Sequence, residues 1–431
     1  RAEFERRLSH TYAGDGLAAP GADDLDLPGT LEGLVEDIPA AADLLDTQDD
    51  APIIRLINGL IAEAARTGAS DIHIEPFETH SLVRFRVDGT LRDVVRPKRE
   101  LHAALISRIK IMAQLDIAEK RLPQDGRIAL RLAGRQVDVR VSTLPTTHGE
   151  RIVLRLLDKG SGQRGLDSLG MAPDTVEPFS RLLAEPHGIL LVTGPTGSGK
   201  STTLYAALQG MDAKSRNIVT VEDPVEYDLP GVGQIQVNSK IDLSFARALR
   251  AILRQDPDVI MIGEIRDLET AQIAVQASLT GHLVLATLHT NDAASAVTRL
   301  VDMGVEPFLL ASTLRGVLAQ RLVRKLCPAC RSPQPAGPTD WELLGPDTPD
   351  QLWHAPGCPE CTRTGYAGRT GIYELIVADE AFQRLIHTGA EEAALRAHAL
   401  AHGSRSLRDD GLRLLAAGLT SAEELLRVTR E

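Results

Sequence analysis

The sequence predicts an α/β protein in which a parallel-sheet domain built around a phosphate-binding loop follows a smaller α+β domain. Apolar strands alternate with helical stretches over residues 165–325, as they do in a parallel sheet covered by helices. A glycine-rich loop follows the first of these strands, and four cysteines in two close pairs come after the last. We therefore expect five segments: 1–50, 51–160, 165–325, 326–371 and 372–431.

The phosphate-binding loop is residues 194–201, which read GPTGSGKS. An apolar run, 188–193, precedes it and a helix-like run, 202–208, follows it, as this motif requires. Glycines allow the tight turn that points successive N–H groups at a phosphate chain, a lysine reaches the terminal phosphates, and a hydroxyl is offered to Mg²⁺. The alternative, a glycine-rich turn with a chance lysine, is disfavoured by the correct flanks. The residues expected to bind the cofactor are Gly194, Pro195, Thr196, Gly197, Ser198, Gly199, Lys200, Ser201 and Thr202.

Composition indicates the class of protein, and the distribution of charge shows where its acidic residues lie. Hydrophobic content of 43% and charged content of 25% are typical of a soluble globular protein, and no apolar run reaches the length of a membrane span. Residues 1–50 carry 13 acidic and 3 basic residues, so they account for −10 of the net charge of −12. We expect this leader to be a flexible linker or, alternatively, a segment that binds a partner. No signal sequence follows Arg1, so we expect a cytoplasmic protein, with a further domain before this residue.

A small α+β domain is predicted over 51–160. Apolar residues recur at helical spacing over 52–65, and a second helix is expected over 101–115. Alternating patterns predict strands at 71–75, 83–88, 127–132, 136–142 and 151–157. Exposure to water is the simplest explanation for their charged faces. The alternative is that Arg140 and Arg155 point at the nucleotide of another subunit, which alternation alone does not decide.

Carboxylates follow two apolar strands of the segment 165–325. Glu222, Asp223 and Glu226 come at the end of the strand 218–221, and Glu264 follows the strand 259–262. Ligands bind at such strand ends in α/β domains, where a carboxylate can position a metal or a water for attack on phosphorus.

A third strand, 282–288, begins at His282 and is followed by His289. We expect the ends of all three strands to converge beside the phosphate loop. Either histidine taken alone is more often a hydrogen-bonded structural residue than a catalytic one.

Two C-x2-C pairs, separated by 27 residues, complete the set of chemically informative motifs; they are Cys327, Cys330, Cys358 and Cys361. Four thiolates from two close pairs suit a tetrahedral, structural Zn²⁺ site. Disulfides or free thiols are the alternative, which a reducing cytoplasm disfavours. We expect a zinc-binding insert over 326–371, in which the metal fixes the loop between the pairs. The segment 372–431 reads as packed helices, and we assign it no chemistry.

Four stretches together resemble the secretion ATPase superfamily: GPTGSGKS at 194–201, TVEDPVE at 220–226, IGEIRDLET at 262–270 and TGHLVLATLHT at 280–290. In that family they are the Walker A, Asp, Walker B and His boxes. The stretches at 69–76, 115–127 and 148–158 are most similar to type II secretion ATPases, and the match runs from about residue 51 to the C-terminus. The tetracysteine insert also fits, although pilus-extension ATPases carry a similar one.

The resemblance implies a RecA-like P-loop ATPase core, a PAS-like domain over 51–160, the cofactors ATP, Mg²⁺ and Zn²⁺, and a homohexamer. Glu226 matches the general base that aligns water, and Glu264 matches the residue that acts through magnesium. Four arginines match those that approach the γ-phosphate, to which a planar guanidinium is suited. The expected catalytic residues are Lys200, Glu226, Glu264, Arg140, Arg155, Arg250, Arg254, His282 and His289.

This resemblance predicts an ATPase that powers assembly of the type II secretion pseudopilus and export of folded proteins across the outer membrane. It also implies recruitment to inner-membrane secretion-platform proteins through an N-terminal domain that we expect to be largely absent from this sequence. A type IV pilus extension ATPase is the alternative within the class. A nucleic-acid-binding motor or adaptor is the alternative from another class. We expect no nucleic-acid partner, because aromatic residues make up 3% of the chain and residues 51–431 are nearly neutral.

Overall fold

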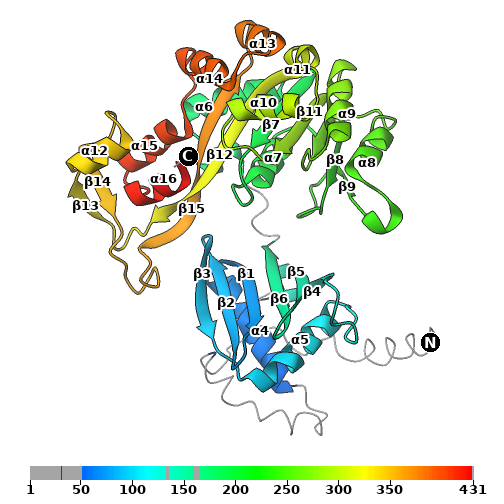
Figure 1. Ribbon diagram of the computed structural model, residues 1–431, viewed down its shortest axis with the longest axis vertical. Coiled ribbons are helices and arrows are strands. Elements are labelled where there is room, and N and C mark those ends of the chain that lie inside the picture. The colour runs from blue at the N-terminus through cyan, green and yellow to red at the C-terminus, as the bar shows by residue number, and fades with distance from the viewer. Residues whose placement is uncertain (1–30, 32–50, 133–134, 159–164, 430–431) are drawn as a thin grey trace. The chain divides into compact units, whose positions relative to one another are not determined.

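The computed structural model describes residues 31, 51–132, 135–158 and 165–429 (Figure 1). Contacts divide the chain into two compact units, Arg1–Ser161 and Gly162–Glu431. The acidic leader expected at 1–50 lies outside the described residues, except for Leu31. Among the helices that are described, none has both the length and the apolar character needed to cross a membrane.

Two helices pack on one face of a six-stranded antiparallel sheet in the first unit, whose strand order is β3-β2-β1-β6-β5-β4. All six apolar positions that predicted the first helix are buried: Ile53, Leu56, Ile57, Leu60, Ile61 and Ala64. The elements are α4 (Ala51–Arg66), β1 (Ala69–Pro76), β2 (Ser81–Val87), β3 (Thr90–Val95), α5 (Arg99–Met112), β4 (Gln124–Leu132), β5 (Arg135–Thr146) and β6 (Gly149–Asp158).

The charged face of this sheet is more than a solvated surface. Asp71 and Glu75 of β1 are buried, and each carboxylate is paired with arginines of the neighbouring strands. Glu75 lies 2.6 Å from the guanidinium of Arg84 and 2.8 Å from that of Arg151, and Asp71 accepts a hydrogen bond of 2.8 Å from Nε of Arg155. Buried carboxylates need such partners, so the alternating charges specify pairing between strands.

The second unit is organised by a seven-stranded sheet of order β15-β12-β7-β11-β10-β8-β9. Every neighbouring pair is parallel except β12 and β15, which are antiparallel. The strands are β7 (Gly188–Thr193), β8 (Ile218–Glu222), β9 (Gly233–Gln236), β10 (Val259–Ile262), β11 (Leu283–Leu288), β12 (Leu314–Leu326) and β15 (Tyr366–Val377). The edge strand β15 therefore comes from sequence beyond the cysteine pairs.

Helices cover both faces of this sheet. Alternate residues of β7 show this, since they enter two different apolar clusters. Leu190 and Val192 pack with α6 (Pro173–Leu183) and α7 (Lys200–Gln209). Ile189 and Leu191 belong to the cluster that contains the helices of the opposite face. Those helices are α8 (Phe245–Ile252), α9 (Leu268–Leu279), α10 (Ala294–Asp302) and α11 (Pro307–Thr313).

The second unit also contains a small hairpin and five further α-helices (Figure 1). The hairpin pairs β13 (Ser332–Pro335) with β14 (Gln351–His354) between the two cysteine pairs. The helices are α12 (Pro338–Leu344), α13 (Glu380–His387), α14 (Glu392–Ala401), α15 (Leu407–Ala416) and α16 (Ala422–Thr429). Apolar residues of α13 to α16 enter the same cluster as Ile189 and Leu191, so this C-terminal region packs on the core of the sheet.

Candidate active site and metal centre

The phosphate loop connects the end of β7 to the first turn of α7. Its backbone takes positive φ angles at Gly194 (148°), Gly197 (79°) and Gly199 (91°). At Gly194 a side chain is also excluded by space, because a Cβ would lie 2.5 Å from the carbonyl oxygen of Gln320. The motif's glycines are therefore required by backbone conformation, and at Gly194 also by the neighbouring strand β12.

Lys200 is 8% exposed, and its Nζ donates to the carbonyl oxygens of Gly194 (2.8 Å) and Pro195 (3.0 Å). Burial lowers the pKa of Lys200 to about 8, against the opposing charge of Glu264. The ammonium group thus closes the loop on itself through carbonyls that a phosphate chain can replace. Ser201 and Thr202 lie exposed on the first turn of α7, where a helix N-terminus favours an anion.

Glu264 and His289 lie at the same edge of the sheet as the phosphate loop, because β10, β11 and β7 are parallel neighbours in register. Nε2 of His289 is 3.5 Å from Oε2 of Glu264, and the guanidinium of Arg266 donates to the other carboxylate oxygen. Burial, followed by the charge of Lys200, lowers the pKa of His289, so its imidazole is neutral near pH 7. Glu264 therefore presents a carboxylate beside Lys200, at the end of the phosphate loop.

The structure distinguishes the acidic residues at the end of β8, where Glu222 is the last residue of the strand and Glu226 follows it. The Glu222 side chain is buried and accepts hydrogen bonds from the hydroxyls of Tyr205 and Thr220 and from the amide of Gln234. Burial and the hydrogen bond to Glu222 raise the pKa of Tyr205, so this hydroxyl stays protonated as a donor. Glu222 is therefore a structural anchor. Glu226 is only partly buried, and its backbone N–H donates to the Tyr205 hydroxyl at 3.2 Å, which ties its segment to α7.

One of the expected catalytic residues, His282, lies at the other end of its strand, and two expected arginines, Arg250 and Arg254, make contacts with neighbouring protein groups. His282 precedes β11, so its strand of six residues separates it from His289 by roughly 20 Å at about 3.3 Å per residue. Its Nδ1 lies 2.8 Å from the carbonyl oxygen of Ala277, a local structural contact. Arg250 pairs with Glu269 of α9, and Arg254 donates to the carbonyl oxygen of Arg250 (2.6 Å).

Arg140 and Arg155 lie in the first unit, where they are directly opposite each other on β5 and β6. The Arg155 side chain is 58% exposed, although its Nε is bonded to Asp71. A long side chain anchored at Nε still presents its terminal nitrogens, so this arginine can approach a ligand while remaining oriented.

Two residues of β12, Gln320 and Arg321, were missed from the sequence. The register pairs Ala319 with Thr193, so the next residues of β12 run beside the phosphate loop. Nε2 of Gln320 donates to the carbonyl oxygen of Ser198 at 2.7 Å, and Arg321 donates from Nη2 to that of Asn291 at 2.9 Å. Within the described part of the chain, Nη1 of Arg321 is buried without a hydrogen-bond partner. No local motif marks these residues, and only knowledge that β12 pairs with β7 could have found them.

The four cysteines form one cluster, whose ligand atoms all lie within 4.8 Å of one another. Sγ of Cys327 is 3.9 Å from that of Cys358, and Sγ of Cys330 is 3.8 Å from that of Cys361. A tetrahedron with zinc–sulfur bonds of about 2.3 Å has an edge of about 3.8 Å, so the spacing fits that ion. Backbone N–H groups of Cys358 and Gly365 point at Sγ of Cys361 (3.2 and 3.1 Å), as donors to a thiolate do.

Comparison with known proteins decides the family. A family model described as "Type II/IV secretion system protein" matches residues 46–427. The chain belongs to this family. Type II secretion system protein HxcR of Pseudomonas aeruginosa is 65% identical over 429 residues, covering 100% of this chain and 88% of the relative.

A second relative by sequence and a solved structure also match this chain. Type II secretion system ATPase E of Vibrio cholerae is 58% identical over 439 residues, covering 100% of this chain and 86% of the relative. A solved structure of the pilus retraction motor PilT with bound ADP has a TM-score of 0.59 and 26% identity, covering 86% of this chain and 96% of that one. Its likeness extends the expected secretion ATPase fold over both units described above.

Proposed function

We propose that this chain hydrolyses ATP to power assembly of the type II secretion pseudopilus, and so the export of folded proteins across the outer membrane. The observation that carries the proposal is the phosphate loop with its buried Lys200 beside the Glu264–His289 pair. This arrangement occurs in a chain that is 58% identical to a type II secretion system ATPase. The chain is therefore assigned to the ATPases of its family.

The residues have separate roles in this proposal. Backbone N–H groups of the loop and the ammonium of Lys200 bind the phosphates of ATP. Ser201 and Glu264 would hold or orient Mg²⁺, which when bound neutralises phosphate charge. Glu226 aligns the attacking water and accepts its proton, and Glu222 holds α7 and the strand end in place. His289 remains neutral, with its Nε2 3.5 Å from Oε2 of Glu264.

We further propose that the protein works as a homohexamer in which arginines complete the nucleotide site. Arg140 and Arg155 of the first unit, with Arg250 and Arg254 of the second, would contact the γ-phosphate in the assembled enzyme. A fixed charge with a planar fork suits phosphate oxygens, and such an arginine is worth about 10³–10⁵ in rate. Release of this contact after hydrolysis would convert chemistry into domain motion.

The proposal also includes a structural zinc site and a place of action in the cell. Cys327, Cys330, Cys358 and Cys361 would hold one structural Zn²⁺, which would fix the hairpin β13–β14. The protein would act in the cytoplasm and reach the inner membrane by binding secretion-platform proteins. The relatives HxcR and ATPase E are type II secretion system proteins, which does not favour the pilus-extension alternative.

The test is complementation of a strain that lacks its type II secretion ATPase, using the full protein that carries this chain. Wild type is expected to restore export of a folded exoprotein, while Lys200→Ala is expected to accumulate normally and fail. Export restored by Lys200→Ala would contradict the proposal. Purified protein would be assayed in parallel for ATP hydrolysis with and without DNA in low salt. Activity that depends on DNA would favour the nucleic-acid motor instead.

A further inference from the structure

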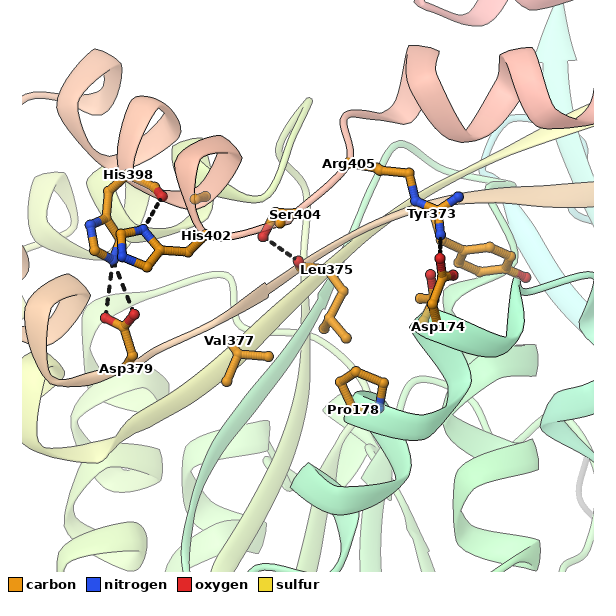
Figure 2. A pocket seen from close by; sticks show the side chains of 13 residues that line it. Asp174, Pro178, Tyr373, Leu375, Val377, Asp379, His398, His402, Ser404 and Arg405 are labelled. Atoms are coloured by element: carbon orange, nitrogen blue, oxygen red, sulfur yellow. Dashed lines mark hydrogen bonds and ion pairs between the residues drawn. The ribbon is translucent and has the colours of Figure 1, made fainter.

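A pocket of about 360 Å³ lies in the second unit, and none of its lining residues belongs to a motif that the sequence singled out. It is formed by α6, the end of β15, and the segment 398–405 that ends α14 (Figure 2). Figure 2 shows Asp379, His398 and His402 together at one end of this pocket, with Arg405 and Asp174 at the other. Potential ligand atoms of the first three residues all lie within 4.8 Å of one another.

Local structure explains why these side chains meet. His398 and His402 are four residues apart at the C-terminal end of α14, so they lie on one helix face. Their rings are stacked with centroids 3.9 Å apart. Asp379 precedes α13 as its N-cap, and one carboxylate oxygen accepts the N–H of Phe382 at 2.7 Å. That hydrogen bond fixes the orientation of the carboxylate toward α14.

The hydrogen bonds also identify which atoms are available to a metal. Nδ1 of His402 lies 2.8 Å from the carbonyl oxygen of His398, and because a carbonyl only accepts, Nδ1 carries the proton. In the neutral ring, Nε2 of His402 therefore keeps its lone pair. Nε2 of His398 lies 3.0 and 3.2 Å from the two oxygens of Asp379, to which it donates a proton, so a metal ion would take the place of this proton. Nitrogen and oxygen ligands on one tetrahedral zinc ion lie about 3.4 Å apart, so small shifts would admit an ion between them.

We propose that Asp379, His398 and His402 bind a divalent transition metal ion of the Zn²⁺ type. Two imidazoles and one carboxylate bind such transition metal ions in preference to Mg²⁺ or Ca²⁺. Three protein ligands leave a position open for water on the side of the pocket. The metal joins the N-cap of α13 to the end of α14.

The same helix reaches toward the ATPase site, which gives this metal a physical consequence. Arg396 of α14 forms an ion pair of 2.6 Å with Asp292, three residues after His289. Fixing the end of α14 therefore also stabilises the helix that anchors the loop after β11. The site is separate from the four cysteines and does not depend on the proposed ATPase function.

The test is a calorimetric titration of Ni²⁺ into untagged protein whose tetracysteine site is already loaded with Zn²⁺. Zinc content is measured by mass spectrometry before and after. One additional ion per chain is expected for wild type, without release of zinc, together with a rise in the thermal midpoint. His402→Ala removes an exposed ligand, and Asp379→Asn keeps a good N-cap while removing the carboxylate. Each is expected to weaken uptake by more than about tenfold.

His387→Ala is the matched control, because His387 is an exposed histidine of α13 outside the cluster. It should bind the additional Ni²⁺ as wild type does. No additional ion in zinc-loaded wild type, or unchanged uptake by both His402→Ala and Asp379→Asn, would overturn the proposal. In either case the Asp379–His398 contact would be a hydrogen bond without a metal role.

Discussion

Exchanging the carboxylate of Glu226 or of Glu222 for an amide should have opposite effects on catalysis and stability. Glu226→Gln keeps the size of a partly buried side chain and removes the proposed base. ATP hydrolysis is expected to fall by about 10²–10⁴-fold, the usual contribution of a positioned base. ATP binding and the thermal midpoint should remain those of wild type.

Glu222→Gln is expected to lower stability instead. Oε1 can still accept from Thr220 (2.5 Å) and Gln234 (3.1 Å), but the new amide nitrogen faces the Tyr205 hydroxyl. That hydroxyl already receives the N–H of Glu226 and the amide of Gln234, so its own proton loses its acceptor. Losing one buried hydrogen bond to a charged group costs about 1.5–3 kcal/mol of unfolding free energy.

Steady-state phosphate release, ATP binding and urea unfolding of the two variants separate these effects. The reasoning predicts an inactive, stable Glu226→Gln and a destabilised Glu222→Gln that retains most of its activity at low temperature. A Glu222→Gln variant of unchanged stability that binds ATP but does not hydrolyse it would refute the assignment and place the base at Glu222.

Three further predictions follow from the contacts of the second unit. Burial holds the pKa of Lys200 at about 8, and a phosphate needs the charged ammonium group. ATP affinity should therefore be constant below this pH and fall as the pH rises through it. An affinity measured by calorimetry that stays constant up to about pH 9 would count against this prediction. We expect Nη1 of Arg321, which has no hydrogen-bond partner among the described residues, to bind a phosphate oxygen of ATP. Arg321→Ala should then weaken ATP binding by about 10- to 100-fold through loss of a charged hydrogen bond, with partial recovery in Arg321→Lys, and unchanged affinity would exclude this contact. Cys358→Ser should lose one Zn²⁺ per chain, and residues 326–371 should become sensitive to protease. A variant that keeps the metal, with a spectrum that reports four sulfur ligands, would disprove the ligand set.

Local patterns in the sequence were sufficient for the phosphate loop and its flanking elements. The spacing of apolar residues placed α4 correctly, and the expected strand–loop–helix at 188–208 is β7, the loop and α7. These features depend on neighbours in sequence, so a single chain reveals them. The cysteine cluster was equally predictable, because two close pairs of thiols suit one ion wherever the intervening loop runs.

Features set by pairing of distant strands were not predictable in this way. Gln320 contacts the phosphate loop, and Arg321 contacts Asn291 after β11, only because β12 lies parallel to β7, which no spacing encodes. The two histidines around β11 were expected at one site, whereas the two ends of a strand lie at opposite edges of a sheet. Asp71 was expected to be solvated and is buried against Arg155, because the register of β1 with β6 places the two residues directly opposite each other.

The most direct test of the account is ATP hydrolysis by Arg155→Ala, with ATP binding measured on the same sample. Arg66→Ala is the control, because Arg66 is an exposed arginine at the end of α4 that pairs with Glu63. Asp71 keeps Ser70 as a donor at 2.7 Å, so the fold should survive. If an arginine of the first unit completes the nucleotide site, Arg155→Ala binds ATP normally and hydrolyses it about 10³–10⁵-fold more slowly, while Arg66→Ala is unaffected. Hydrolysis by Arg155→Ala at the wild-type rate would contradict a role for this arginine in catalysis, and only the assignment of the phosphate loop as the ATP-binding site would remain.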